Sequence, residues 1–164
     1  MFKIVACVNK KMALGSKGEL LYHIKDDLKN FSSMTSFNGV VVMGRKTYES
    51  IKKPLKNRIN IILTSDKDYS IEPNDNVFIL HSIDDAVELC NTLFDDKELF
   101  LIGGGSLYKE FLERGLVDEI RLSIVDDDKD GDVYFPEINL DDWYTYFALK
   151  GVDYEYKILK KPHD

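Results

Sequence analysis

The sequence predicts an α/β fold: a single domain with a central, mostly parallel β-sheet flanked by helices, and an antiparallel C-terminal hairpin. Three observations support this fold class. The chain has 164 residues, which suits one domain and is short for two. Its short apolar runs are separated by helical patterns, as in proteins whose helices connect parallel strands. The runs are apolar throughout, which is typical of strands buried on both faces. We therefore expect residues 1–164 to form one domain.

The expected strands and helices alternate along most of the chain. The strands are expected at residues 2–8, 40–43, 59–63, 77–80, 99–102 and 120–125. The helices are expected at about residues 25–35, 47–51, 83–94 and 106–113. Ser82 followed by Asp85 resembles a capping box, and Thr47 and Ser106 are candidate N-caps of their helices.

The pattern changes after residue 118, where helical periodicity stops. The segments IRLSIV, VYF, YTYFALKG and YEYKILK are typical of strands, and the last two suggest a hairpin through Gly151. We expect antiparallel strands to complete the sheet. Residues 64–76, TSDKDYSIEPNDN, have no regular pattern and are expected to form a surface loop.

Composition and charge exclude several classes of protein. The formal charge of -7 argues against a broad surface for nucleic acid or anionic membrane. Cys7 and Cys90 lie in apolar segments without CxxC spacing, so reduced, buried thiols are expected instead of a disulfide or a thiolate metal site. No apolar run has the length of a signal peptide or membrane span. We therefore expect a cytoplasmic protein without nucleic-acid or membrane partners.

One carboxylate lies on the apolar face of an expected helix. At about 100° per residue, the helix IKDDLKNFSSMT places Asp27 on one face with Ile24, Leu28, Phe31, Met34 and Thr35. A carboxylate withdrawn from water has a raised pKa, in the range that is useful for proton transfer. Asp27 is therefore a candidate proton-handling residue. The alternative is that it caps the helix or lies at the edge of the apolar stripe.

A second candidate is the glycine run of LFLIGGGSLY at residues 99–108, which leads from a buried strand into a helix. Gly103, Gly104 and Gly105 have no side chains, so a ligand can approach the backbone, and a helix N-terminus favours phosphate. The run is not the full dinucleotide fingerprint, because Tyr108 stands where that pattern has Gly or Ala. A tight turn without a ligand is the alternative.

A third candidate is the basic segment VVVMGRKTYESIKKPLKNR at residues 40–58 of an otherwise acidic protein. Gly44 and Arg45 follow an expected strand and precede a short helix, so this turn also suits a phosphate. Arg58 or Lys53 could hold a carboxylate. The alternative is a solvated basic face. The basic residues of the segment are Arg45, Lys46, Lys52, Lys53, Lys56 and Arg58.

An acidic segment matches the calcium-loop pattern D-x-D-x-D-G-x5-E. It comprises Asp126, Asp128, Asp130, Gly131 and Glu137. A calcium loop of this type joins two helices, whereas a strand is expected before this segment and no clear helix after it. An acidic loop between strands is the favoured interpretation. No metal-ligand spacing joins the three histidines, so we expect no metal site.

Four blocks of the sequence, taken together, resemble dihydrofolate reductase. They are LLYHIKDDLKNF, VVVMGRKTYESIKKPLKNRINIILTS, LFLIGGGSLYKEF and GDVYFP, and their order and spacing cover nearly the whole chain. The resemblance implies that NADPH donates a hydride to 7,8-dihydrofolate, giving 5,6,7,8-tetrahydrofolate. We also expect the protein to be a monomer.

The resemblance also implies the substrate site. Asp27 would bind the pterin and promote protonation of N5 through water, while hydride adds to C6. Tyr22 stands where the family has a tryptophan that holds this water, and Ser123 where it has a threonine bonded to the acidic residue. Arg58 would bind the glutamate α-carboxylate. The residues implied to wall the pterin and benzoyl pocket are Val5, Ala6, Leu28, Phe31, Ile51, Leu55 and Ile102.

For the cofactor, the resemblance implies three groups of contacts. Arg45, Lys46 and Thr47 would contact the phosphates, Thr64 and Ser65 the adenosine 2′-phosphate, and Gly104, Gly105 and Ser106 the pyrophosphate. Tyr108, Ala6 and Leu14 would lie near the nicotinamide, and the first Gly-Gly bond would be cis. A mobile loop over the site is expected at about residues 9–24. The implied cofactor-binding residues are Ala6, Leu14, Gly44, Arg45, Lys46, Thr47, Thr64, Ser65, Ile102, Gly103, Gly104, Gly105, Ser106, Leu107 and Tyr108.

Other functions remain as alternatives. A riboflavin-pathway reductase that acts on a ribosylated pyrimidine would have a similar fold, but Asp27 and GDVYFP favour the folate branch. A nucleotide-binding module without turnover would not need both Asp27 and Arg58. A calcium-binding structural domain built on the acidic loop could be tested by calorimetric titration with calcium.

Overall fold

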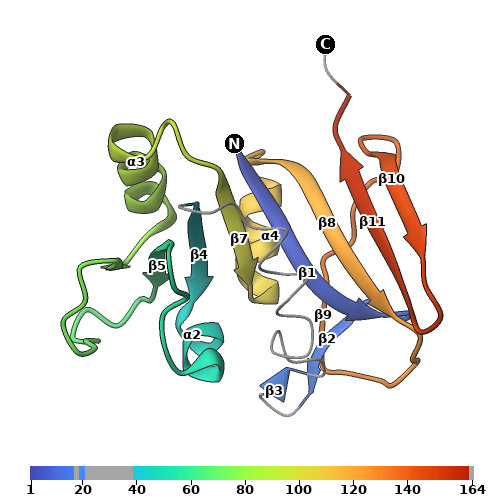
Figure 1. The fold of residues 1–164 in the computed structure, drawn as a ribbon, viewed down its shortest axis with the longest axis horizontal. Helices are drawn as coiled ribbons and strands as arrows, with labels where there is room; N and C mark the ends of the chain where they lie inside the picture. Colours follow the sequence, from blue (N-terminus) through green and yellow to red (C-terminus); the bar gives the residue numbers. More distant parts are fainter. Residues whose placement is uncertain (17–18, 21–38, 163–164) are drawn as a thin grey trace.

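The structure is a computed structural model that describes residues 1–16, 19–20 and 39–162. Its centre is an eight-stranded sheet with the order β10-β11-β8-β1-β7-β4-β5-β6 (Figure 1). The strands that pair in parallel are β1 (Phe2–Asn9), β4 (Val40–Gly44), β5 (Ile59–Leu63), β6 (Val77–Leu80), β7 (Leu99–Gly103) and β8 (Val117–Val125). The predicted strands and the mostly parallel α/β sheet are thus confirmed.

The C-terminal hairpin is also confirmed. Strands β10 (Tyr144–Lys150) and β11 (Tyr154–Lys160) pair antiparallel, and the chain turns at Gly151. Strand β11 adds to β8 in antiparallel register, so the hairpin extends the parallel sheet at one edge. Figure 1 shows the hairpin on the side of the sheet opposite to β5, beyond which β6 forms the other edge.

The helices follow directly from strands or short turns. Among the described residues they are α2 (Arg45–Ile51), α3 (Ile83–Leu93) and α4 (Gly105–Glu113), whereas the helix expected at residues 25–35 lies within the undescribed segment 21–38. The Ser82 cap is confirmed, because its side chain accepts a hydrogen bond from the Asp85 backbone N–H at 3.0 Å. The caps predicted at Thr47 and Ser106 are wrong. Both helices begin right after a glycine in extended conformation, Gly44 and Gly104, so Thr47 and Ser106 lie inside the first turn.

A small second sheet has the order β3-β2-β9 and comprises β2 (Ala13–Ser16), β3 (Glu19–Leu20) and β9 (Val133–Tyr134). The expectation that VYF would help to complete the main sheet is therefore wrong for this strand. The reason is local pairing: β9 pairs antiparallel with β2, in the segment where a loop over residues 9–24 was expected.

Both faces of the central parallel strands β1, β4, β5 and β7 are largely buried, as their continuous apolar runs predict, whereas the edge strand β10 is exposed. One hydrophobic cluster contains Val40 and Val42 of β4 with side chains of α3 and α4. The second contains Val41 and Met43 of the same strand with Tyr48 of α2. Alternate residues of a strand point to opposite faces, so α3 and α4 cover one face and α2 covers the other.

The acidic segment at residues 126–132 connects two strands, β8 and β9, as the favoured interpretation of its sequence predicts. Its carboxylates pair with lysines of the β1–β2 turn: Asp126 with Lys10, and Asp130 with Lys11 Nζ at 2.8 Å. Within the described ranges, no three His, Cys, Asp or Glu side chains are arranged to hold a metal ion.

Two further expectations concern the cysteines and the membrane. Cys90 is buried, Cys7 is partly buried, and neither forms a disulfide, as expected. No helix among the described residues is long and apolar enough to cross a membrane.

Candidate active site

Two glycine turns lie side by side at the carboxyl ends of β4 and β7. Met43 is in register with Gly103, so the strands end together. A Cβ atom built on Gly44 would lie 3.8 Å from the Gly103 carbonyl oxygen and 3.9 Å from the Gly104 nitrogen. The two turns that the sequence marks separately as phosphate sites are therefore parts of one site. This edge of a parallel sheet is where α/β proteins commonly bind ligands.

Gly103 has a conformation that other residues rarely adopt. Its φ angle is 138°, and its peptide bond to Gly104 is cis, which confirms the cis bond implied by the resemblance. A Cβ atom here would lie 3.1 Å from Thr47 Oγ1 and 3.5 Å from the Tyr108 hydroxyl oxygen. The side chains of Thr47 and Tyr108 thus lie against the turn and leave no room for a side chain in it.

The second small sheet packs against the same turn. A Cβ atom on Gly105 would lie 2.9 Å from Val133 Cγ1 and 3.4 Å from Leu14 Cδ1. Gly104 and Gly105 remain partly exposed and Ser106 is exposed, so the backbone of the turn is accessible to a ligand. Leu14 and the glycine turn, both expected at the cofactor, are brought together by this packing.

Tyr108 connects α4 to the central strand β1. Its hydroxyl donates a hydrogen bond to the Val5 carbonyl oxygen at 2.8 Å, and its ring centroid lies 5.4 Å from that of Phe135. Burial raises the pKa of Tyr108 above its ordinary value, so the hydroxyl stays protonated and remains a donor. The hydrogen bond holds the start of α4 beside Val5 and Ala6 of β1.

The apolar residues expected at the two ligands separate into two clusters. Of those expected at the substrate, Val5, Ile51, Leu55 and Ile102 belong to the cluster on the α2 face, whereas Ala6 belongs to the other cluster. Those expected near the nicotinamide, Ala6, Leu14 and Tyr108, belong to the cluster on the other face. The two groups meet at Val5 and Ala6, which are consecutive residues of β1.

Arg45 lies between α2 and the loop that follows β5. Its Nε donates to Glu49 Oε1 at 2.9 Å, and its Nη1 donates to Asp66 Oδ2 at 3.2 Å. The guanidinium carbon lies 4.4 Å from the centroid of the Tyr69 ring. The hydrogen bond to Glu49 raises the pKa of Arg45. The structure thereby brings Arg45 next to the segment of Thr64 and Ser65, which the resemblance implies at the adenosine 2′-phosphate.

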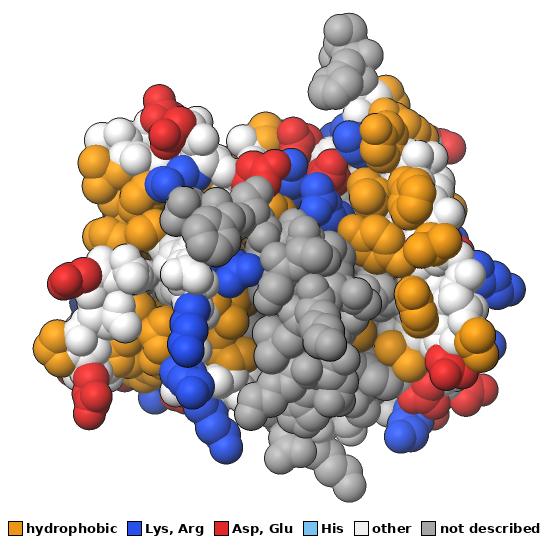
Figure 2. Space-filling model, viewed as in Figure 1, with side chains coloured by type: hydrophobic (Ala, Val, Ile, Leu, Met, Phe, Trp, Pro, Cys, Tyr) orange, Lys and Arg blue, Asp and Glu red, His pale blue; other side chains and the backbone are white. Residues whose placement is uncertain are grey.

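The basic segment between α2 and β5 is held by a buried amide. The Asn60 side chain accepts a hydrogen bond from the Leu55 N–H at 2.9 Å and donates to the carbonyl oxygens of Leu55 and Arg58 at 3.0 and 3.2 Å. Sequence analysis missed Asn60, although a polar residue inside the apolar run INIIL was a usable signal. In Figure 2, Lys and Arg side chains gather over this part of the molecule.

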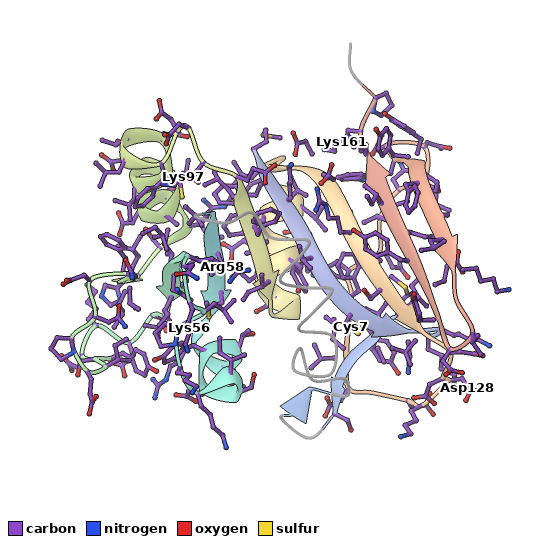
Figure 3. The ribbon with its side chains drawn as sticks, viewed as in Figure 1. Cys7, Lys56, Arg58, Lys97, Asp128 and Lys161 are labelled. Atoms are coloured by element: carbon purple, nitrogen blue, oxygen red, sulfur yellow. The ribbon has the colours of Figure 1, made fainter. Side chains whose placement is uncertain are left out.

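Arg58 is only partly exposed, and burial lowers its pKa. Its Nη1 donates to the Lys56 carbonyl oxygen at 2.8 Å. Figure 3 shows Arg58 and Lys56 on the segment that leads into β5. A guanidinium that has lost part of its hydration gains from pairing with a carboxylate, which is the role expected for Arg58.

The remaining site residues divide into described and undescribed ones. Ser123 lies near the carboxyl end of β8, partly buried, in register with Cys7 of β1 and Tyr156 of β11. Lys46 and Ser106 are exposed at their turns, and Leu107 is partly buried. Four residues expected at the substrate or in catalysis lie outside the described residues: Tyr22, Asp27, Leu28 and Phe31.

Comparisons with known proteins all point to one family. A family model described as dihydrofolate reductase matches residues 1–158. A dihydrofolate reductase of Staphylococcus aureus (strain Mu50) is 32% identical over 148 residues, which cover 90% of this chain and 86% of that protein. A bifunctional dihydrofolate reductase-thymidylate synthase 1 of Arabidopsis thaliana is 34% identical over 150 residues, which cover 84% of this chain and 29% of that protein.

A solved structure agrees with the sequence comparisons. The dihydrofolate reductase from Enterococcus faecalis complexed with NADP(H) and RAB-propyl is similar to this chain with a TM-score of 0.83 and 26% sequence identity. The similarity covers 99% of this chain and 97% of that one.

Proposed function

The chain belongs to the dihydrofolate reductase family and reduces 7,8-dihydrofolate to 5,6,7,8-tetrahydrofolate with NADPH, and we propose that its glycine turns hold the cofactor while Asp27 manages the proton. The observation that carries this assignment of residues is the pairing of the two glycine turns beside Arg45. It supports one continuous site for a dinucleotide that has several phosphates.

The residues at the turns fit NADPH. The open backbone of Gly104, Gly105 and Ser106 suits the pyrophosphate, because N–H groups at a helix start bind anions. Arg45 and the segment of Thr64 and Ser65 suit the 2′-phosphate. When bound, NADPH supplies a hydride to C6 of the pterin. The other cofactor contacts we propose are Ala6, Leu14, Gly44, Lys46, Thr47, Ile102, Gly103, Leu107 and Tyr108.

The substrate half of the site is proposed on the α2 face. Val5, Ile51, Leu55 and Ile102 share one hydrophobic cluster there, which supports their role as the wall of the pterin and benzoyl pocket. Arg58 binds the glutamate α-carboxylate, and Asn60 holds the segment that carries it. Ala6, Leu28 and Phe31 complete the proposed wall.

We propose that Asp27 binds the pterin and promotes protonation of N5 through a water molecule. The support is its place on the apolar face of the expected helix and the block LLYHIKDDLKNF that surrounds it. Tyr22 and Ser123 are positioning residues in this proposal. The Tyr22 hydroxyl holds the water, and the Ser123 hydroxyl forms a hydrogen bond with the carboxylate.

The activity is tested with purified protein, NADPH and dihydrofolate. We expect the absorbance of the reduced nicotinamide to fall only when both substrates are present. Absence of turnover would contradict the assigned reaction.

The role of Asp27 is tested with Asp27→Asn. We expect this variant to keep NADPH binding but to lose a factor of about 10²–10⁴ in rate at neutral pH, because the proton path is removed. The rate should recover partly as the pH falls, since substrate that is already protonated needs less help. Asp26→Asn is the matched control, because the helical pattern places Asp26 on the polar face. Normal turnover of Asp27→Asn near neutral pH would refute the proton role.

We also propose that the enzyme works as a monomer in the cytoplasm. Neither Cys7 nor Cys90 forms a disulfide, which suits a reducing compartment. Size-exclusion chromatography with light scattering measures the mass of the active species. A mass near 18.9 kDa is expected for one chain.

A further inference from the structure

We propose that Asp66 competes with the 2′-phosphate of the cofactor for Arg45 and thereby weakens the preference of this enzyme for NADPH over NADH. This inference rests on the proposed cofactor site. It concerns a residue that neither the sequence motifs nor the comparisons mark, and it is carried by the contacts of Arg45 and of the loop after β5.

The Arg45 guanidinium is engaged on two edges and one face. Glu49 and Asp66 accept from its Nε and Nη1, and the Tyr69 ring lies 4.4 Å from its carbon. The Arg45 side chain is nevertheless 42% exposed, so an anion from solvent can reach it. A phosphate that binds Arg45 here must share it with carboxylates that are already present.

The Asp66 carboxylate is fixed in place by its own loop. Its Oδ1 accepts from the Asp68 N–H at 2.9 Å, while its Oδ2 accepts from Arg45. The Asp66 backbone N–H donates to Thr64 Oγ1 at 3.2 Å, and its carbonyl oxygen accepts from the Tyr69 N–H at 3.2 Å. Asp66 therefore cannot rotate away from Arg45 without breaking the turn that orients it.

Glu49 differs from Asp66 in this respect. It lies one turn from Arg45 on α2, an (i, i+4) pair, and its side chain has one more rotatable bond than that of Asp66, while the two side chains are similarly exposed, at 51% and 47%. Such a side chain moves aside at little cost when a phosphate arrives. Asp66 is thus the carboxylate whose negative charge stays in the site.

The position of Asp66 decides which cofactor is affected. It directly follows Thr64 and Ser65, the residues proposed to bind the 2′-phosphate, its N–H donates to Thr64 Oγ1 and its carboxylate contacts Arg45, so its charge would lie beside that phosphate. The negative charges of the Asp66 carboxylate and the 2′-phosphate repel each other. The repulsion is moderate because Asp66 and Arg45 are partly exposed to water. NADH has a ribose 2′-hydroxyl instead, which does not repel a carboxylate and can donate a hydrogen bond to it.

The test uses Asp66→Asn, which removes the charge but keeps an oxygen that accepts from the Asp68 N–H. We expect the Kd for NADPH to fall by about 3- to 10-fold, and the Kd for NADH to stay the same or rise. The gain for NADPH should shrink as ionic strength is raised, because salt screens charges at an exposed site. Both Kd values are measured by calorimetric titration of the complete chain.

Asp68→Asn is the matched control. It makes the same change in charge two residues away in the same loop, and we expect it to change both Kd values by less than about 2-fold. Asp66→Ser is a second variant that removes the charge and keeps a hydroxyl acceptor. Thermal melts verify that all variants are folded.

Three outcomes would overturn the inference. NADPH affinity that is unchanged or weaker in both Asp66 variants would show that the carboxylate does not oppose the phosphate. An equal gain in Asp68→Asn would show a general effect of net charge. In both cases wild-type turnover with dihydrofolate would remain, so the proposed function would stand. Failure of the wild-type protein to bind NADPH would remove both proposals together.

Discussion

At the scale of single residues, two buried ionisable groups are kept neutral by their surroundings. Tyr108 lies on α4 and Cys90 on α3, and burial raises the pKa of each. For Tyr108 the consequence is functional, because a protonated hydroxyl is needed to donate to the Val5 carbonyl oxygen beside the proposed nicotinamide site. For Cys90 the consequence is a dependence of stability on pH.

Cys90 should make the folded state less stable in alkaline solution. Burial raises the pKa of its thiol from 9.0 to about 11. Below the lower value the thiol is protonated in both states and contributes no pH dependence. Between the two values the unfolded chain releases the proton while the folded protein keeps it, so the free energy of unfolding falls as pH rises.

The contribution of Cys90 is isolated by comparison with Cys90→Ala. From about pH 8 to about pH 11, wild type should lose about 2 kcal/mol more of its unfolding free energy than the variant does. Urea unfolding at each pH, in the presence of a reductant, measures both proteins. Parallel pH curves for the two proteins would contradict the assignment.

At the scale of elements, buried amides position the segments that form the site. Asn9, at the end of β1, accepts from the N–H groups of Lys11 and Ala13 and donates to the Lys129 carbonyl oxygen at 2.7 Å. It thereby ties the β1–β2 turn to the acidic loop before β9. Asn60 performs the same task for the segment between α2 and β5. In both cases one fully buried side chain satisfies several backbone groups of a loop.

Asn60→Ala should damage both stability and substrate binding. The variant leaves partly buried backbone groups of Leu55 and Arg58 without this partner, so we expect a loss of about 1–3 kcal/mol in unfolding free energy. Because the segment carries Arg58, the KM for dihydrofolate should rise several-fold while the Kd for NADPH stays within about 2-fold.

Urea unfolding and steady-state kinetics measure the two effects of Asn60→Ala. The control is Asn91→Ala, a change at an exposed position of α3. It should change the free energy of unfolding by no more than about 0.5 kcal/mol and leave the KM for dihydrofolate unchanged. An unchanged KM together with a destabilised fold would mean that Asn60 supports the core alone.

The elements also show what could be predicted from sequence. The strands at residues 40–43 and 59–63 and the turn at Gly103–Gly105 were found because continuous apolar runs and glycines are local signals. The helix starts at Arg45 and Gly105 were missed by up to two residues, because hydroxyl side chains suggested caps that glycines provide. The pairing of β9 with β2 depends on backbone contacts between distant segments, which no local pattern encodes.

At the scale of the whole molecule, the candidate site is assembled from turns that are far apart in the chain. The residue patterns marked the turns at Gly44–Arg45 and Gly103–Gly105 separately, and only the resemblance assigned them, together with Thr64–Ser65, to one cofactor. Only the parallel order of β5, β4 and β7 brings them to one edge. The ion pair between Arg45 and Asp66 arises from this assembly, so no motif could have indicated it. Local sequence patterns therefore predict which residues contact a ligand, and the order of the strands determines which of these residues lie in the same site.

The continuous sheet also predicts that the chain unfolds as one unit. Trp143, the one tryptophan of the sequence, is 8% exposed before β10 and belongs to the same hydrophobic cluster as Phe2 and Phe111. A residue near the hairpin edge is therefore packed with the centre of the molecule. We expect the urea transition measured by Trp143 fluorescence to coincide with the transition measured by far-UV circular dichroism.

A matched variant moves the reporter to the opposite edge of the sheet. Phe78 of β6 lies next to Phe94 and is partly buried, so Phe78→Trp in a Trp143→Phe background reports on β5 and β6. In that protein too, the fluorescence and circular dichroism midpoints should agree, because both edges share one cooperative core. If the β6 reporter or Trp143 unfolded at a lower urea concentration than the circular dichroism signal, the sheet would contain two folding units instead of the single domain that its 164 residues predict.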